Sequence, residues 1–195
     1  MRYRTIASSL ALSLVLATRA FAADNYEIDP VHSRVGFSVR HLTISNVQGR
    51  FMDFAGKIQY DEQDVTKSSV DVKIQAKSVN TENEMRDNDL RSPNFFDVAK
   101  YPEISFKSSK VEKQGEGYVL VGTLTMHGVS REVQVPFTSL GKAKDPWGGT
   151  RVGFDAGVTI NRQDYGLTYA KAIETGGLVV GNDVKIELNI EAAKK

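Results

Sequence analysis

A two-residue alternation of apolar and polar side chains is the feature that most constrains how this chain can fold. Residues 70–76 read Val-Asp-Val-Lys-Ile-Gln-Ala, and residues 184–190 read Val-Lys-Ile-Glu-Leu-Asn-Ile. Such alternation is typical of β-strands with one face in a core and the other in water. Eight segments show it, and the sequence therefore predicts an all-β fold of eight strands. The segments are 35–39, 54–60, 70–76, 104–106, 118–126, 133–137, 152–160 and 184–190.

Short turn-forming segments separate several of these strands. Residues 114–117, 127–130 and 145–149 are rich in glycine and polar residues and each joins two expected strands. Strands joined in this way are antiparallel neighbours, because a parallel pair needs a long crossover. Eight such strands can close into a barrel, which removes the exposed edges of an open sheet. A two-sheet sandwich fits the same alternation and is the alternative architecture.

One segment departs from the strand pattern. Residues 81–84, Thr-Glu-Asn-Glu, have the form of a capping box, in which the threonine caps a helix and the second glutamate reaches back. A short helix is expected to run to about Leu90 and to stop before Ser92-Pro93. We expect this charged helix to cap one end of the barrel, with Phe95 and Phe96 plugging that end.

The N-terminal segment has the form of a signal peptide, residues 1–22. Two arginines precede an apolar run over residues 6–17, and Ala20-Phe21-Ala22 gives the small-x-small pattern of a cleavage site. The run is shorter than the roughly 20 residues of a membrane-spanning helix. We therefore expect residues 23–195 to form a single domain in the periplasm.

The charge balance excludes several classes of protein. Of 25 basic residues three lie in the expected signal peptide, which leaves 22 against 24 acidic ones. A chain so balanced lacks the basic face that binds nucleic acid and the polybasic stretch that binds anionic membranes. No cysteine is present, so neither a disulfide nor a lipid attached to cysteine can contribute.

Motifs for catalysis and metal binding are missing from the sequence. His32, His41 and His127 are not spaced as metal ligands, and no Gly-x-Ser-x-Gly or phosphate-binding glycine loop occurs. Asp87 and Asp89 lie beside arginines on the expected helix, where a solvated face with local ion pairs is the interpretation we favour. We therefore expect no catalytic residue, no metal and no cofactor.

The expected barrel interior is apolar and contains small residues. Gly56, Ala76, Gly122 and Ala156 interrupt the inward rows. An eight-stranded barrel is just wide enough to be packed solid or to hold one small ligand. The small residues favour a cavity because they leave volume between larger neighbours. A solid apolar core is the alternative.

Several motifs resemble those of one known family over essentially the whole expected mature chain. They are residues 26–33 and 35–41, Leu90-Arg91-Ser92 with Phe95-Phe96-Asp97, Lys100-Tyr101-Pro102, residues 124–129 and residues 145–149. The family is that of the YceI-like proteins, which bind polyisoprenoids in the bacterial envelope. The resemblance implies a lipocalin-like eight-stranded barrel whose tunnel holds isoprenoid chains, including quinone tails. Many relatives have histidine where this chain has Asp89, so no head-group role carries over to that position.

Together these features predict a periplasmic binding or carrier protein for a polyisoprenoid or other long apolar lipid of the isoprenoid quinone or undecaprenyl type. Each buried CH₂ contributes roughly 0.8 kcal/mol, so the lipid is held by exclusion of water. The residues expected to contact it are Phe37, Val39, His41, Phe54, Val72, Ile74, Phe106, Leu120, Leu124, Phe137, Phe154, Val158, Ile160 and Tyr165.

Contacts to the lipid head group are expected at strand ends. The residues that gather there are Arg40, His41, Asn161, Arg162 and Tyr165. Two other functions stay open: an enzyme that modifies a lipid or small molecule at the barrel mouth, using His41 or the helix carboxylates, and an envelope stress protein whose lipid is structural. A transient contact with the membrane or a membrane protein, and a homodimer, also stay open.

Overall fold

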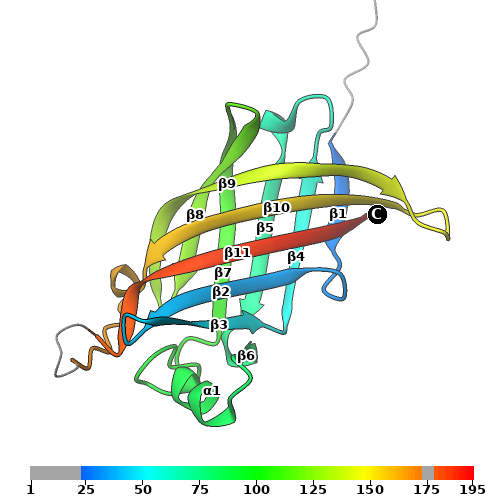
Figure 1. Cartoon of the computed structure of the whole chain (residues 1–195). Helices are drawn as coiled ribbons and strands as arrows, with labels where there is room; N and C mark the ends of the chain where they lie inside the picture. Colours follow the sequence, from blue (N-terminus) through cyan, green and yellow to red (C-terminus); the bar gives the residue numbers. More distant parts are fainter. Residues whose placement is uncertain (1–22, 173–177) are drawn as a thin grey trace, which may run out of the picture.

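The computed structural model describes residues 23–172 and 178–195, which form one antiparallel sheet of eleven strands with one α-helix (Figure 1). Short 3-10 turns η1 (Val65–Lys67), η2 (Ala76–Ser78) and η3 (Arg162–Tyr165) interrupt the chain, and the helix is α1 (Glu84–Arg91). The strands are β1 (Asp24–Ile28), β2 (Arg34–His41), β3 (Ser45–Phe51), β4 (Phe54–Tyr60), β5 (Ser69–Gln75), β6 (Val79–Asn80), β7 (Glu103–Gln114), β8 (Gly117–Met126), β9 (Val129–Lys144), β10 (Thr150–Asn161) and β11 (Val180–Lys194).

The sheet closes into a barrel because β1 pairs with both β4 and β11. Strands β1 and β2 follow one another along the same edge of β11. On its other side, β1 pairs with β4 and β2 pairs with β3. Strand β4 then pairs with β5, and β3 pairs with β6. The pairs β1 and β2, β3 and β4, and β5 and β6 therefore each form one long, interrupted strand. Together with β7 to β11 they make an eight-stranded antiparallel barrel in chain order. The predicted barrel is confirmed, and the sandwich alternative is not what the chain forms.

Three strands were missing from the prediction: β1, β3 and β6, of which β6 has only two residues. Strand β1 buries only Tyr26 and Ile28, so its alternation is too short to recognise, and β3 carries a glycine, Gly49, on its inward row. The ring of Phe37 lies over Gly49, where an added Cβ would be 2.3 Å from Cζ of that ring. The missing side chain at Gly49 is what lets Phe37 pack there.

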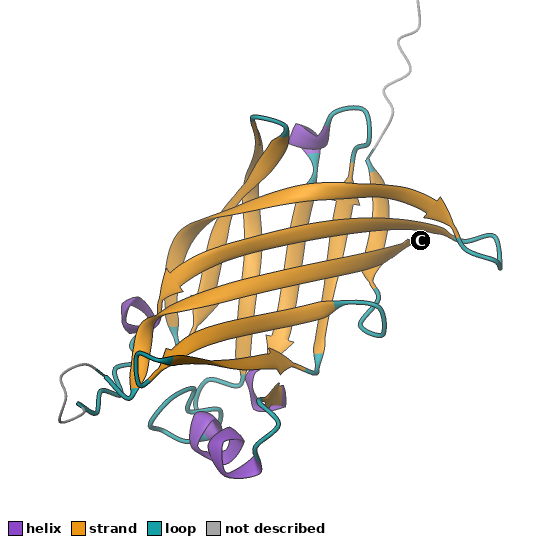
Figure 2. Ribbon diagram, viewed as in Figure 1, coloured by secondary structure: helices purple, strands orange, loops and turns teal. Residues whose placement is uncertain are grey.

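The helix α1 lies outside the barrel at one end, next to β6 (Figure 2). It starts one residue after its N-cap, Asn83, whose Oδ1 accepts a hydrogen bond from Arg86 N at 3.0 Å. The predicted cap, Thr81, is wrong, because Thr81 N and Oγ1 donate instead to Asp87 Oδ1, at 2.8 and 2.5 Å. The expected end near Leu90 is confirmed.

The charged residues of α1 fasten it to the barrel. Asp87 is only 5% exposed, so a fully solvated helix face is wrong at this position. Arg91 donates to the carbonyl oxygens of Lys77 and Val79, both at 2.8 Å. Asp89 Oδ1 accepts from Asn94 Nδ2 at 2.8 Å and so holds the turn that follows the helix. No helix in the described part of the chain is long and apolar enough to cross a membrane.

After the helix, the chain turns back over the end of the barrel. Phe95 and Phe96 are half-buried and pack against the core, as expected. The rings of Phe96 and Phe51 meet edge to face with centroids 5.7 Å apart. This segment covers the end of the barrel at which β3 and β6 lie.

Candidate ligand-binding cavity

The barrel encloses an apolar cavity of about 150 Å³. Its walls come from strands all around the barrel, and no charged side chain is found among the described residues that line it. Tyr60 and Ser68 alone of these residues carry a hydroxyl group. Eight of the residues expected to contact a ligand line it: Val72, Ile74, Phe106, Leu120, Leu124, Phe137, Phe154 and Val158.

The other expected contact residues lie outside the cavity wall. Phe54, Ile160 and Tyr165 are buried in the surrounding hydrophobic core, at most 9% exposed. Phe37 is half-buried over Phe51, with ring centroids 5.8 Å apart. These four residues belong to the hydrophobic core around the cavity and do not line it.

Two more expected contact residues lie at the far end of β2. Val39 is half-buried and pairs with Val47 of β3 and Val184 of β11. His41, the last residue of β2, is half-buried and pairs with Ser45 and Val180. Neither lines the cavity, so any contact they make with a ligand lies beyond it.

Sequence reasoning omitted further lining residues. Most of them lie on the inward rows that the alternation predicts, so the same signal identifies them. Three lie outside these rows, namely Ile28, Ser68 and Val111. The rest are Val35, Ile58, Tyr60, Val70, Val133, Val135, Ala156, Ile186, Leu188 and Ile190.

The small residues of the inward rows do not create the cavity in the way expected. A Cβ added at Gly56 would lie 2.7 Å from Cδ1 of Ile28, and one at Gly122 would lie 2.6 Å from Cζ of Phe106. Large neighbours therefore fill the space at both glycines. Ala76 is 1% exposed in η2 and does not line the cavity, whereas Ala156 does.

Two residues of the expected head-group cluster, Asn161 and Arg162, make hydrogen bonds that hold the backbone, whereas Arg40 is exposed. Arg162 is 3% exposed, and its guanidinium donates to the carbonyl oxygens of Gly181, at 2.8 Å, and Leu167. Burial lowers the pKa of Arg162 and raises that of Tyr165. Asn161 Oδ1 caps η3 by accepting from Gln163 N at 2.9 Å. Asn161 and Arg162 thus stabilise the turn that follows β10 and hold it against the start of β11.

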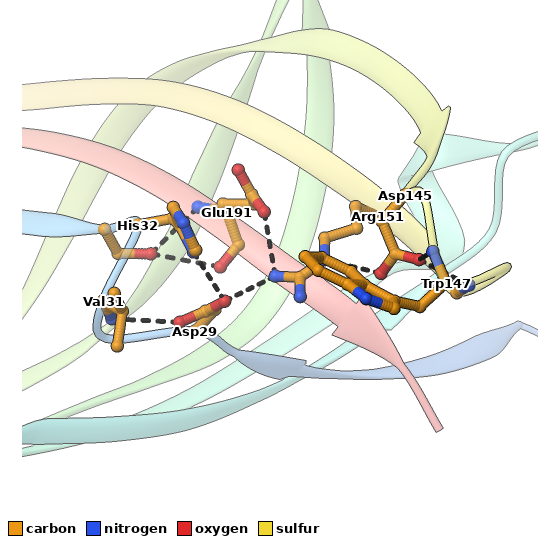
Figure 3. Close-up of polar contacts among 9 residues, drawn as sticks. Asp29, Val31, His32, Asp145, Trp147, Arg151 and Glu191 are labelled. Atoms are coloured by element: carbon orange, nitrogen blue, oxygen red, sulfur yellow. Dashed lines mark hydrogen bonds and ion pairs between the residues drawn. The ribbon is translucent and has the colours of Figure 1, made fainter.

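An ion-pair cluster around Arg151 lies at another part of the barrel (Figure 3). Arg151 Nη1 donates to Glu191 Oε1 at 2.9 Å and to Asp29, and Nε donates to Asp145 Oδ2 at 3.2 Å. The three carboxylates come from the β1–β2 turn, the β9–β10 turn and β11. Two of the motifs that resemble the family, at 26–33 and 145–149, therefore supply carboxylates that Arg151 links to β11.

The same cluster contains a group of potential metal ligands. Ligand-type atoms of Asp29, His32 and Glu191 lie within 4.8 Å of one another. The Arg151 guanidinium already binds both carboxylates, so a positive charge balances them. Hydrogen bonds from His32 and from Arg151 lower the pKa of Asp29 well below its usual range, and those carboxylates raise the pKa of Arg151.

We expect Arg151→Met to lower the urea midpoint of unfolding near neutral pH. The pKa of Asp29 is lower in the folded state than in the unfolded chain, where it is about 3.9. The ionised carboxylate therefore contributes fully to the free energy of unfolding above that pH, and the contribution is lost as the pH falls further. The difference in urea midpoint between the parent and Arg151→Met should thus become smaller below about pH 4. Lys185→Met, which removes the exposed pair with Glu187, is the control and should change little. A difference in midpoint that is the same at all pH values would contradict a stabilising ion pair between Arg151 and Asp29.

The closed antiparallel barrel around an apolar cavity has a lipocalin-like fold. A family model described as a YceI-like domain matches residues 26–192. The chain therefore belongs to the YceI-like family.

Relatives and solved structures agree with this assignment. A UPF0312 protein of Photorhabdus laumondii is 40% identical over 167 residues, covering 85% of this chain and 87% of the relative. The Campylobacter jejuni YCEI protein is similar with a TM-score of 0.70 and 35% identity, covering 80% of this chain and 90% of that one. A polyisoprenoid binding domain from Saccharophagus degradans has a TM-score of 0.64 at 20% identity, covering 87% and 98%, and so shows likeness of fold.

Proposed function

We propose that the protein is a periplasmic binding or carrier protein that holds a polyisoprenoid, or another long apolar lipid of the isoprenoid quinone or undecaprenyl type, inside its barrel. The observation that carries the proposal is the cavity, whose described lining contains no charged side chain. A neighbour in fold is named a polyisoprenoid binding domain, which supports this class of ligand.

Binding by exclusion of water accounts for such a site. The lining offers a ligand apolar contact from every side, and each buried CH₂ contributes roughly 0.8 kcal/mol. A cavity of about 150 Å³ is the size that accommodates benzene. A chain of many isoprene units is far larger, so the lining side chains must move apart when it enters. We therefore expect the loaded barrel to be wider than the one described.

The lining favours binding over catalysis. Aside from the hydroxyls of Tyr60 and Ser68, the described lining holds no acid, base or nucleophile. Tyr60 Oη already shares a hydrogen bond of 3.2 Å with Ser139 Oγ. Ser68 Oγ accepts from Asp61 N at 3.1 Å. Both hydroxyls are engaged within the fold.

The proposed location depends on the signal peptide, which lies outside the described residues. Its basic start and Ala20-Phe21-Ala22 site support export to the periplasm. N-terminal sequencing of protein from the cell envelope should then begin at or near Ala23. Finding Met1 at the N-terminus would contradict export by cleavage.

A carrier differs from a protein with a structural lipid in that it releases its cargo. We expect protein loaded with its own lipid to exchange it for a deuterium-labelled isoprenoid quinone or undecaprenol supplied in excess. Mass spectrometry of the intact complex over time measures the exchange. A lipid that stays in place until the protein unfolds would show a structural role instead.

A further inference from the structure

The β9–β10 hairpin projects beyond the barrel and carries the single tryptophan of the chain in its turn (Figure 1). Trp147 is 87% exposed. Its turn is nevertheless firmly held, because Asp145 Oδ1 accepts from Trp147 N at 3.0 Å and from Gly149 N at 2.7 Å. Asp145 is held in turn by Arg151 Nε at 3.2 Å (Figure 3). The fold thus presents Trp147 to solvent at a fixed position.

Apolar and charged side chains share a groove with Trp147. A β-bulge between β9 and β10 leaves Leu140 without a partner residue, and Leu140 is 58% exposed. Leu140 and Trp147 line one open groove of about 470 Å³ together with Lys142 and Lys144. The two carboxylates of the groove, Asp145 and Glu191, are both paired with Arg151. Lys142 pairs with Glu62, whereas Lys144 makes no ion pair with any residue that the structure describes. We call Leu140, Lys142, Lys144 and Trp147 the hairpin surface.

This composition suits a membrane. Tryptophan has an apolar body and one N–H donor, and it prefers the boundary between lipid head groups and acyl chains. Lysines beside it are attracted to anionic head groups. Leaving tryptophan and leucine exposed is unfavourable in water, and both gain when they enter this boundary.

We propose that the hairpin surface docks on an anionic lipid bilayer, with Trp147 inserted among the head groups. The proposal rests on the proposed function, because a long apolar lipid reaches a periplasmic protein from a membrane. The groove and the cavity each take a residue from the same face of β10, because Val152 lines the groove and Phe154, two residues further on, lines the cavity. Docking therefore brings this part of the cavity wall to the bilayer.

The single tryptophan gives a direct test with the unmodified protein. Fluorescence of Trp147 should shift to shorter wavelength, and its quenching by acrylamide should fall, when vesicles of equal parts phosphatidylcholine and phosphatidylglycerol are added. Phosphatidylcholine vesicles alone should give a weaker effect. An emission spectrum that vesicles do not change would overturn the proposal. So would a shift that appears without vesicles and grows with protein concentration, since a second copy would then cover the surface.

Variants separate the two parts of the surface. In vesicle sedimentation, Trp147→Ala should weaken binding about tenfold on either vesicle. Lys144→Gln should weaken it roughly fivefold on the anionic vesicles only. Met85→Ala, at an equally exposed position in α1, is the control and should bind as the parent does. If Trp147→Ala binds vesicles as well as the parent does, Trp147 does not insert among the head groups.

Lipid retention distinguishes this proposal from the proposed function. Trp147→Ala should keep the lipid that copurifies with the parent, because Trp147 does not line the cavity. A parent that holds lipid but ignores vesicles would refute membrane docking alone. A parent that binds vesicles but never contains lipid would refute the carrier function alone.

Discussion

Leu120→Trp is expected to reduce the lipid that copurifies with the protein at least tenfold and to leave the barrel folded. Leu120 lies on the inward face of β8 and lines the cavity of about 150 Å³. An indole at this position fills volume that a bound lipid requires. It enters open space, so it avoids most of the 1–3 kcal/mol that overpacking a solid core costs. Lipid extracted per mole of protein and urea unfolding measure the two effects.

A matched variant on the same strand controls for the bulk of tryptophan. Thr123 is exposed on the outer face of β8, so Thr123→Trp should retain lipid as the parent does. If Leu120→Trp unfolds more easily by several kcal/mol and the parent never contained lipid, the interior is a solid core and the cavity account is wrong.

Gly122→Ala, two residues further along the same face, is expected to lower the free energy of unfolding by about 1–3 kcal/mol. A Cβ at Gly122 would lie 2.5 Å from the carbonyl oxygen of Lys107 and 2.6 Å from Cζ of Phe106. The first of these atoms belongs to the backbone of β7 and cannot move without disturbing the sheet. A single methyl group is therefore expected to cost more stability here than an indole does at Leu120.

The control for this variant is Gly153→Ala in β10. The nearest atom to a Cβ there is Leu140 Cβ at 3.4 Å, an ordinary contact, so its stability should stay within about 0.5 kcal/mol of the parent. Urea unfolding of both variants checks the comparison. Equal stability of Gly122→Ala and the parent would show that Phe106 does not fill the space over Gly122.

Alternation predicts the faces of the strands because it is a local property of the sequence. It identified the inward rows of β2, β4, β5 and β7 to β11, and with them most of the cavity wall. Closure of the barrel depends on β1, which has five residues and pairs with β4 and β11 from distant parts of the chain. Such pairing is not visible in a local pattern.

Whether an inward position borders empty space also depends on distant neighbours. Gly122 was expected to leave volume, but Phe106 from β7 fills it. Thr81 was expected to cap α1, but Asp87 engages it. The Arg151 cluster joins carboxylates from three separate segments, although Asp29 and Asp145 both lie in motifs that the sequence analysis singled out. In each case the deciding contact is tertiary.

Mass spectrometry of the intact protein, purified from the cells that make it, tests most directly whether the barrel holds a long apolar lipid. We expect a mass above that of the polypeptide by one lipid, and solvent extraction should recover a molecule with an isoprenoid chain. The mass of the bare polypeptide under gentle conditions, or an extract without any long apolar lipid, would contradict it.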